Sequence, residues 1–473
     1  MSLSASLSFA SIGLGLTARR AELVASNVAN ANRPGYLQRA LETGANGRPE
    51  VGRSVSPGLV ALRREAEAKA GGADVSAAFH ARLDAALGDP DEAGSLQDRI
   101  SALEAALVSA TNNPSGAIEL GVVARTASDV VDGLRGLDDV VQAERQEADT
   151  RIGSQVRQLN ADLQEVARLN AEIVRTRSSG GDPASILDRR GLLIDRINEA
   201  IPVRELARDH DTVALVAEGG ALLLDGRASE IGFTPRAPIT AGMDYPTHLS
   251  GLTIDGREVP NSGAASPVRG GRLSALFDLR DVVAPEAQGR LDAMAAELIA
   301  RSADTGADPT LTGAPGLFTE AGSTLDPAGE AGLAGRITLN PLAEPGSPEL
   351  WRLRDGFGAA AQGSGSDAGN LSRLSGILSA VAAPEMAGLG DGVGSVAGLA
   401  GRLKSMVSAD RVAASQASEH FSAMAATRRE ARDGGAVDVD AEMRRLVEIE
   451  QAYAANARVV QAVSEMMDRL TGI

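Results

Sequence analysis

The chain has 473 residues and no cysteine, and its 46 Lys and Arg against 63 Asp and Glu give a formal net charge of -17. Nucleic acids and anionic membranes are bound mainly through clustered Lys and Arg, so both are excluded as expected partners. The lack of cysteine excludes disulfides, thiolate catalysis and most structural zinc sites. Aromatic residues make up only 2% of the chain, so we expect a core of Ala, Leu, Val and Ile with few large pockets, which favours a scaffold over a ligand-binding enzyme.

The first 40 residues predict an amphipathic helix followed by a turn. Apolar and small residues recur at alternating spacings of four and three, which is the pattern of a coiled-coil seam. The predicted seam is Leu3, Leu7, Ala10, Leu14, Thr17, Ala21, Val24 and Val28. Asn30, Asn32 and the Pro34-Gly35 pair then end the helix, because Asn tolerates left-handed backbone and Pro cannot continue a helix. Residues 1–20 lack the pattern of a secretory signal, and no window is long and apolar enough to cross a membrane.

Residues 431–473 predict a second helix of the same kind. Asp438 or Asp440 can cap its start. The predicted seam is Met443, Leu446, Glu450, Tyr453, Ala457, Val460, Ser464 and Met467. Two such helices at opposite ends of one chain can form a coiled coil with each other and leave their other faces for neighbouring subunits.

Between the two ends, the pattern predicts a mainly α chain with a β insertion. Residues 41–90 are expected to be an extended connector. Residues 91–200 predict long helices, with Leu96, Ile100, Leu103 and Leu107 on one face and Leu159, Leu163, Val166 and Ile173 on another, and a turn at 111–116. Residues 201–269 read as a β-rich outer domain, with an Asp-Gly hairpin signal at Asp255-Gly256. We expect a returning helix at 270–305, loops and short strands at 306–360, and the second half of the helical domain at 361–430.

The terminal motifs resemble those of the bacterial flagellar axial proteins. "SNVANANRPGY", residues 26–36, is similar to the asparagine-rich turn of rod, hook and hook-associated proteins, with Arg33 where threonine is usual. "EMRRLVEIEQAYAANARVVQAVSEMMDRL", residues 442–470, resembles the C-terminal helix of the same group.

The middle of the chain resembles the family of hook-associated protein 1. Four segments carry this resemblance: "ILDRRGLLIDRI" at 186–197, "GGRLSALFDLRDVVAPEAQGRLDAMAAEL" at 270–298, "RITLNPL" at 336–342 and "GNLSRLSGILSAV" at 369–381. The first has Gly191 where Asp is usual. Rod and hook proteins are expected to be mostly β outside their termini, so the helices at 91–200 argue against them. A hook or rod protein remains the alternative.

The resemblance implies an elongated molecule of nested, discontinuous domains. The terminal helices would form a coiled coil at one end, long helices from both halves would pack in a bundle, and the β domain would lie far from the termini. The residues predicted to form the assembly interface are Leu3, Leu7, Leu14, Val24, Asn27, Val28, Asn30, Asn32, Pro34, Gly35, Tyr36, Met443, Leu446, Tyr453, Asn456, Val460 and Met467. Tyr36 and Tyr453 could equally pack within their own subunit.

The resemblance also implies function and partners. It implies a structural role in a ring of subunits between hook and filament, outside the cell, after export by the flagellar type III system. The implied partners are other copies of this chain, the hook protein, the second junction protein (hook-associated protein 3) and a cytoplasmic export chaperone.

No pattern in the sequence predicts a catalytic, cofactor-binding or metal site. The four histidines, His80, His210, His248 and His420, are scattered and none lies in a nucleophile motif. The glycine runs at 363–369 and 388–395 lack the strand and lysine of a phosphate loop, so turns are expected there. An enzyme carried on a flagellar scaffold would have only residues 201–269 and 306–360 for its chemistry, and these hold no catalytic cluster.

Overall fold

A computed structural model describes residues 3–33, 36–43, 49–53, 56–326, 329, 331–433 and 437–471. It contains two compact units. Unit 1 comprises Met1–Ala70, Gln158–Glu230 and Phe421–Ile473, and unit 2 comprises Gly71–Arg157 and Ile231–His420. The predicted interface residues Pro34 and Gly35, and the side chain of Leu3, lie outside what the structure describes. The chain is mainly α with small sheets, as predicted.

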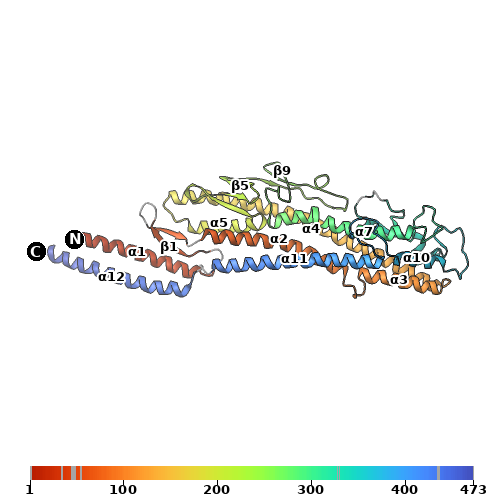
Figure 1. The fold of residues 1–473 in the computed structure, drawn as a ribbon. Helices are drawn as coiled ribbons and strands as arrows, with labels where there is room; N and C mark the ends of the chain where they lie inside the picture. The colour runs from red at the N-terminus through yellow and green to blue at the C-terminus, as the bar shows by residue number, and fades with distance from the viewer. Residues whose placement is uncertain are drawn as a thin grey trace. The chain divides into compact units, whose positions relative to one another are not determined.

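The two terminal helices form an antiparallel pair in unit 1. Helix α1 (Leu3–Asn30) lies alongside α12 (Val439–Thr471), with the start of α1 and the end of α12 at the same end of the pair (Figure 1). Asp438 caps α12, because its carboxylate accepts a hydrogen bond of 3.0 Å from the backbone N–H of Ala441. The predicted coiled coil between the two ends of the chain is therefore confirmed.

The prediction of an extended connector at 41–90 is wrong for most of its length. A short hairpin of β1 (Arg39–Thr43) and β2 (Pro49–Arg53) is followed by the long helix α2 (Pro57–Leu87). Pro57 stands at the first helical position, where it needs no N–H partner, and the sequence after it is rich in alanine. In unit 1 the buried residues Ala66 and Ala70 pack against Ala425, so small side chains let two helices approach closely.

The predicted helices at 91–200 are confirmed as α3 (Leu96–Asn112), α4 (Ala117–Ser178) and α5 (Ala184–Ala200). The turn signal falls where α3 ends and α4 begins. All eight face residues named for these helices are buried. Helix α4 contributes a segment to each unit, as do α2 and α11 (Val396–Asp433).

The β region forms two separate sheets and not one domain. In unit 1, β3 (Val203–Ala207), β4 (Val213–Ala217), β5 (Leu222–Asp225) and β6 (Arg227–Ala228) pair in chain order, and the 3-10 turn η1 (Asp209–Asp211) joins the first two. In unit 2, β7 (Ile231–Gly232), β8 (Leu252–Ile254) and β9 (Arg257–Val259) form a second sheet. The predicted hairpin is confirmed, because Asp255 and Gly256 have φ of 48° and 78° between β8 and β9.

Buried polar groups explain why the β region divides. The amide of Asn170 in α4 donates to the carbonyl of Val213 at 2.9 Å, which attaches the first sheet to unit 1. The segment between β7 and β8 of the second sheet is held in unit 2 by Arg145, whose guanidinium donates to the carbonyls of Thr240, Ala241 and Met243. Neither set of hydrogen bonds can be predicted from the periodicity of the sequence.

The returning helix predicted at 270–305 is present with an irregular centre. Helix α6 (Gly271–Asp278) runs through a π-helical turn, η2 (Leu279–Val283), into α7 (Ala284–Ala303). The turn carries Arg280, which is fully buried and pairs with Asp149 at 2.6 Å and with Asp281 at 2.7 Å. Its guanidinium also stacks near the rings of Phe233 and Phe277. This cluster joins α6 and η2 to α4 and to the segment before β8 within unit 2.

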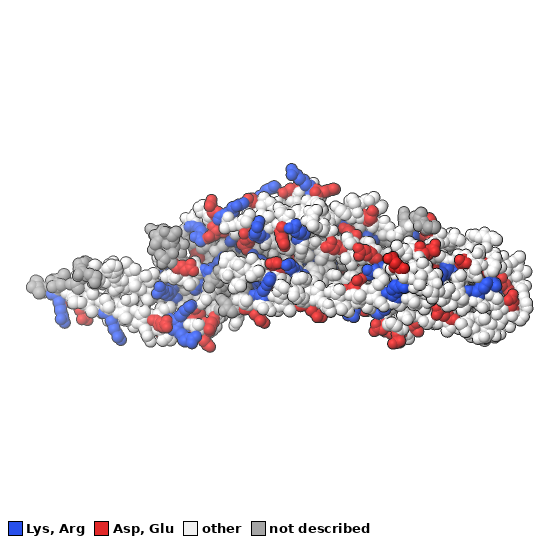
Figure 2. Space-filling model, viewed as in Figure 1, with Lys and Arg blue, Asp and Glu red and all other residues white. Residues whose placement is uncertain are grey.

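The remaining elements agree with the expected loops and short strands. Strand β10 (Phe318–Glu320) pairs with β11 (Ile337–Leu339), near the short helices α8 (Leu333–Arg336), η3 (Pro341–Ala343) and α9 (Arg352–Asp355). Helix α10 (Gly369–Ser379) and α11 follow; the glycine run at 388–395 lies in a loop, and the run at 363–369 is a loop whose last residue begins α10. Figure 2 shows acidic and basic side chains intermixed on the visible face, without a region of one sign.

Candidate assembly interface

The predicted seam of α1 faces α12. Ala10, Thr17 and Val24 are buried, and the residues between them in the pattern are half-buried. Thr17 has no hydroxyl partner across the pair, because its side chain donates back to the carbonyls of Gly13 and Leu14 in its own helix. The small side chains predicted for this seam therefore form the contact face of the helix.

The predicted seam of α12 is half-buried at some positions and exposed at others. Leu446 and Val460 are half-buried as expected. Ala457 is also half-buried, but Met443, Glu450, Tyr453, Ser464 and Met467 are exposed, and the residues directly before three of these, Glu442, Ile449 and Val463, are more buried. Both choices continue a four-three alternation, so the spacing of one helix could not separate them.

Two polar side chains of α12, Asn456 and Glu442, contact α1 and set the register of the helix pair. A Cβ atom at Gly13 would lie 2.9 Å from the amide nitrogen of Asn456, so the glycine leaves room for that side chain. Fourteen residues further along α1, the amide of Asn27 donates to the carboxylate of Glu442 at 2.9 Å. The two contacts keep a constant offset along antiparallel helices, and a polar residue in a seam is a known device for fixing register.

The asparagine-rich turn is tied to the start of α12 by a buried hydrogen-bond network. The side-chain oxygen of Asn27 accepts hydrogen bonds from the hydroxyl of Tyr36 and the backbone N–H of Arg39, each at 2.9 Å. Glu442 has no exposed surface and also accepts a hydrogen bond of 2.7 Å from the amide of Gln38. Because every one of these groups has a partner, the network can be buried without the cost of unsatisfied polar atoms.

The predicted interface residues differ in how far they are buried. In α1 and the turn, Val24 and Asn27 are buried, Leu7, Leu14, Val28, Asn30 and Tyr36 are half-buried, and Asn32 is exposed. In α12, Leu446, Asn456 and Val460 are half-buried, and Met443, Tyr453 and Met467 are exposed. Tyr36 packs within its own subunit, since it bonds Asn27 and stacks on Arg39. The interface residues predicted from the sequence do not include Glu442 and Gln38, although Glu442 is the first residue of the C-terminal motif.

The pair of terminal helices keeps a large apolar surface exposed. In α1, Phe9 and Ile12 are 68% and 58% exposed. In α12 the exposed apolar side chains are Val439, Met443, Val447, Tyr453, Val459, Met466 and Met467. Figure 2 shows mostly uncharged atoms over the visible face of this helix pair.

A hollow beside the seam adds to this surface. It has a volume of about 470 Å³ and is lined by Thr17, Ala18, Ala21, Ile449, Glu450 and Tyr453. Small residues from α1 form one wall and larger residues from α12 form the other. A hollow of this kind could accept a protruding apolar side chain of a neighbouring helix.

Neither a metal site nor a membrane span occurs in the part of the chain that the structure describes. No three His, Asp or Glu side chains are grouped there as metal ligands. No described helix combines the length and the apolar character needed to span a bilayer.

Comparison with protein families places the chain among flagellar axial proteins. The family model described as flagellar hook-associated protein FlgK helical domain matches residues 80–316, half of the 473-residue chain. A second model, flagellar basal body rod FlgEFG protein C-terminal, matches residues 434–473, which contain α12. The chain belongs to the family of flagellar hook-associated proteins that carry the FlgK helical domain.

Two curated relatives agree with this assignment. Flagellar hook-associated protein 1 from Salmonella typhimurium strain LT2 and the protein of that name from Salmonella typhi are each 24% identical over 306 residues, covering 60% of this chain and 55% of the relative. The chain thus spans about half the length of the curated relatives it matches. The flagellar hook junction protein FlgK from Burkholderia pseudomallei is 19% identical with a TM-score of 0.45, over 56% of this chain and 46% of that one.

Proposed function

We propose that this chain is a structural subunit of the bacterial flagellum at the junction between hook and filament. Copies would join in a ring through the exposed apolar faces of α1 and α12. The observation that carries the proposal is the surface of the terminal pair, where Phe9, Ile12 and the apolar residues of α12 remain exposed after the two helices have packed together. Exposed apolar patches on a folded unit are characteristic of protein interfaces.

Family membership supports the location and the partners. The curated relatives are named flagellar hook-associated protein 1, and the solved relative is described as a hook junction protein. We infer the hook protein and hook-associated protein 3 as neighbours in the assembly, with a cytoplasmic chaperone before export through the flagellar type III system. The predicted interface residues of α1 and α12 would act together in this assembly, and no catalytic step is assigned. A rod or hook protein is the second candidate, because the C-terminal match is shared with rod proteins.

The position in the flagellum can be tested by immunogold electron microscopy of detached flagella, with antibody against residues 201–269. We expect one narrow band where the hook meets the filament. Label along the whole hook would identify a hook protein instead, and the absence of label from any axial structure would overturn the proposal.

The interface can be tested in the same cells with two variants. Phe9→Ser together with Ile12→Ser removes exposed apolar surface without adding charge, so the helix pair should still fold while the junction band is lost. Val381→Ser is the matched control, because Val381 is 70% exposed and belongs to unit 2, which contains neither α1 nor α12. Normal incorporation of the double variant would contradict the proposed interface.

A further inference from the structure

Unit 1 contains a cavity of about 810 Å³ between α2, α5 and the sheet that begins with β3. The low aromatic content predicts few large pockets, and this cavity is one that the sequence pattern did not locate. Its volume lies within the range of small-molecule sites, which are mostly apolar with a few placed polar groups. The apolar wall includes Val60, Ala61, Leu192, Ile194, Val213 and Val216.

Most charged groups at this cavity are paired. Arg64 donates to Asp195 at 2.6 Å and also pairs with Glu205. Arg63 pairs with Asp195 at 2.7 Å. At the edge of the cavity, Asp188 accepts hydrogen bonds from two arginines of the β1–β2 hairpin, Arg39 at 3.3 Å and Arg53 at 3.1 Å. These side chains neutralise one another and leave little charge for a ligand.

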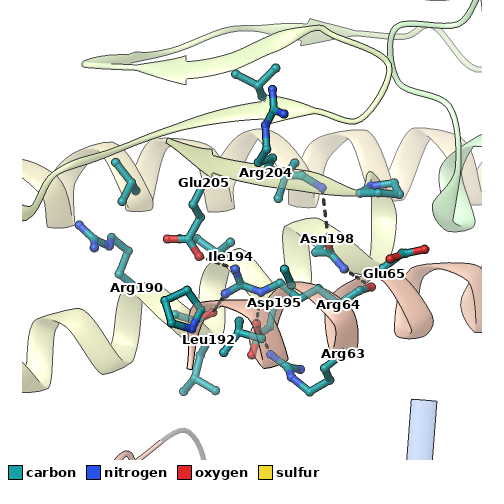
Figure 3. Close-up of a pocket in the computed structure, with 18 of the residues that line it drawn as sticks. Arg63, Arg64, Glu65, Arg190, Leu192, Ile194, Asp195, Asn198, Arg204 and Glu205 are labelled. Atoms are coloured by element: carbon teal, nitrogen blue, oxygen red, sulfur yellow. Dashed lines mark hydrogen bonds and ion pairs between the residues drawn. The ribbon is translucent and has the colours of Figure 1, made fainter. Parts of the chain in front are cut away.

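Arg190 is the exception. Its side chain lines the cavity and is 6% exposed, but it forms no ion pair with any carboxylate among the described residues. Its Nη1 atom donates to the side-chain oxygen of Asn170 at 2.8 Å and to the carbonyl of Asp211 at 2.6 Å, and both are neutral acceptors. In Figure 3 the carboxylate of Glu205 lies between Arg190 and Arg64 and is bonded to Arg64.

Arg190 is a buried cation whose neighbouring carboxylates, Glu205 and Asp211, are paired with other arginines, Arg64 and Arg177. Burial lowers the pKa of Arg190 to about 10, although nearby Glu205 acts in the opposite direction. A buried charge without an oppositely charged partner is costly, and a bound carboxylate would relieve that cost through charge-assisted hydrogen bonds. The remaining guanidinium donors, Nε and Nη2, are the groups available for such bonds.

We propose that this cavity binds a small amphipathic carboxylate, whose anionic group lies against Arg190 and whose apolar chain lies along the wall formed by α2, α5 and β4. No residue of α1 or α12 lines this cavity, so the proposed ligand site does not depend on the proposed function of the terminal helix pair. The ligand class follows from one unpaired buried cation beside an apolar space. A single carboxylate matches that charge and a chain of about ten carbons fits that volume.

Isothermal titration calorimetry of the full chain with decanoate tests the proposal. We expect saturable binding at a single site, and at least about 10-fold weaker binding of 1-decanol, which has the same chain without the charge. A blocked peptide with a glutamate between leucines is titrated in parallel. Absence of saturable decanoate binding overturns the proposal, whether or not the peptide binds.

Variants then assign the two parts of the site. Arg190→Gln should weaken decanoate binding at least about 10-fold and leave 1-decanol binding unchanged. Arg204→Gln, at an exposed arginine of the same cavity, should change decanoate binding less than about two-fold, because an exposed charge is screened by water. Val216→Phe keeps Arg190 and narrows the apolar space, so it should weaken the binding of both compounds. Circular dichroism melting checks the fold of each variant, and unchanged decanoate affinity in folded Arg190→Gln or folded Val216→Phe would overturn the assignment.

Discussion

The carboxylate of Glu442 accepts a hydrogen bond of 2.9 Å from the side-chain amide of Asn27, although the two residues are 415 positions apart in the chain. Both side chains are buried. Because Asn27 ends the packed part of α1 and Glu442 begins that of α12, this one contact joins the asparagine-rich turn to the C-terminal helix. It gives the turn a structural role in aligning the two ends of the chain.

Replacement of Asn27 by leucine should destabilise the terminal helix pair. The change keeps the approximate volume but removes one of the donors to Glu442, which keeps Gln38 and Arg445, and removes the acceptor shared by the hydroxyl of Tyr36 and the N–H of Arg39, at an expected cost of about 2–4 kcal/mol. Amide hydrogen exchange of α1 and α12 would report the loss as faster exchange. Asn32→Leu is the control, because Asn32 is exposed and comes from the same run. Equal protection in the two variants would show that the network does not hold the helices together.

The corrected seam of α12 predicts opposite results at adjacent positions. Ile449→Lys places a charge against α1 and should cost about 2–4 kcal/mol, whereas Glu450→Lys should change stability by less than about 0.5 kcal/mol. The helical signal in far-UV circular dichroism, followed during urea unfolding, measures both. A larger effect at Glu450 would restore the seam predicted from the sequence alone.

Removal of the carboxylate of Asp149 should be among the most damaging changes in unit 2. Asp149→Leu leaves the guanidinium of Arg280 buried without this partner and also removes the acceptor for the N–H of Arg236, so the expected cost is about 3–5 kcal/mol. Trp351, the single tryptophan, lies in unit 2, and its fluorescence reports the unfolding of that unit. Asp410→Leu breaks a more exposed pair with Arg290 in the same unit and should cost less than about 1 kcal/mol. Similar losses in the two variants would argue against a special role for the buried pair.

Asp138 should make unit 2 less stable at neutral pH than in mild acid. Burial raises the pKa of Asp138 above its ordinary value of 3.8, against the hydrogen bond from Gln288, and neighbouring Asp292 adds to the rise. A carboxyl group with a raised folded-state pKa stabilises the fold when protonated, and this contribution is lost as the pH rises through that pKa.

The substitution Asp138→Asn tests the predicted direction of this pH dependence. It should stabilise unit 2 at pH 7 by up to about 1 kcal/mol, and the gain should disappear below about pH 3.8, where the aspartate is protonated in both states. Urea unfolding followed by Trp351 fluorescence at the two pH values gives the comparison. A gain that persisted in acid would have to come from packing or hydrogen bonding.

Local patterns predicted much of the fold because they act within one segment of chain. The helices at 91–200 follow from apolar residues on one face, and the Asp255-Gly256 hairpin follows from a turn that needs positive φ. Residues 57–87 show the limit of the same approach. The sequence-based expectation of an extended connector at 41–90 misses α2, although its alanine content and Pro57 favour a helix.

The sequence by itself determined that two amphipathic helices at opposite ends of the chain would pair, because each needs to bury an apolar stripe. Only the tertiary structure decided that Ile449 and Asn456 face α1, that Glu442 bonds Asn27, and that Arg190 lies in a cavity without an ion pair to any carboxylate of the described residues. The physical reason is that periodicity describes the faces of one helix, whereas the burial of a polar or charged side chain depends on partners contributed by distant segments.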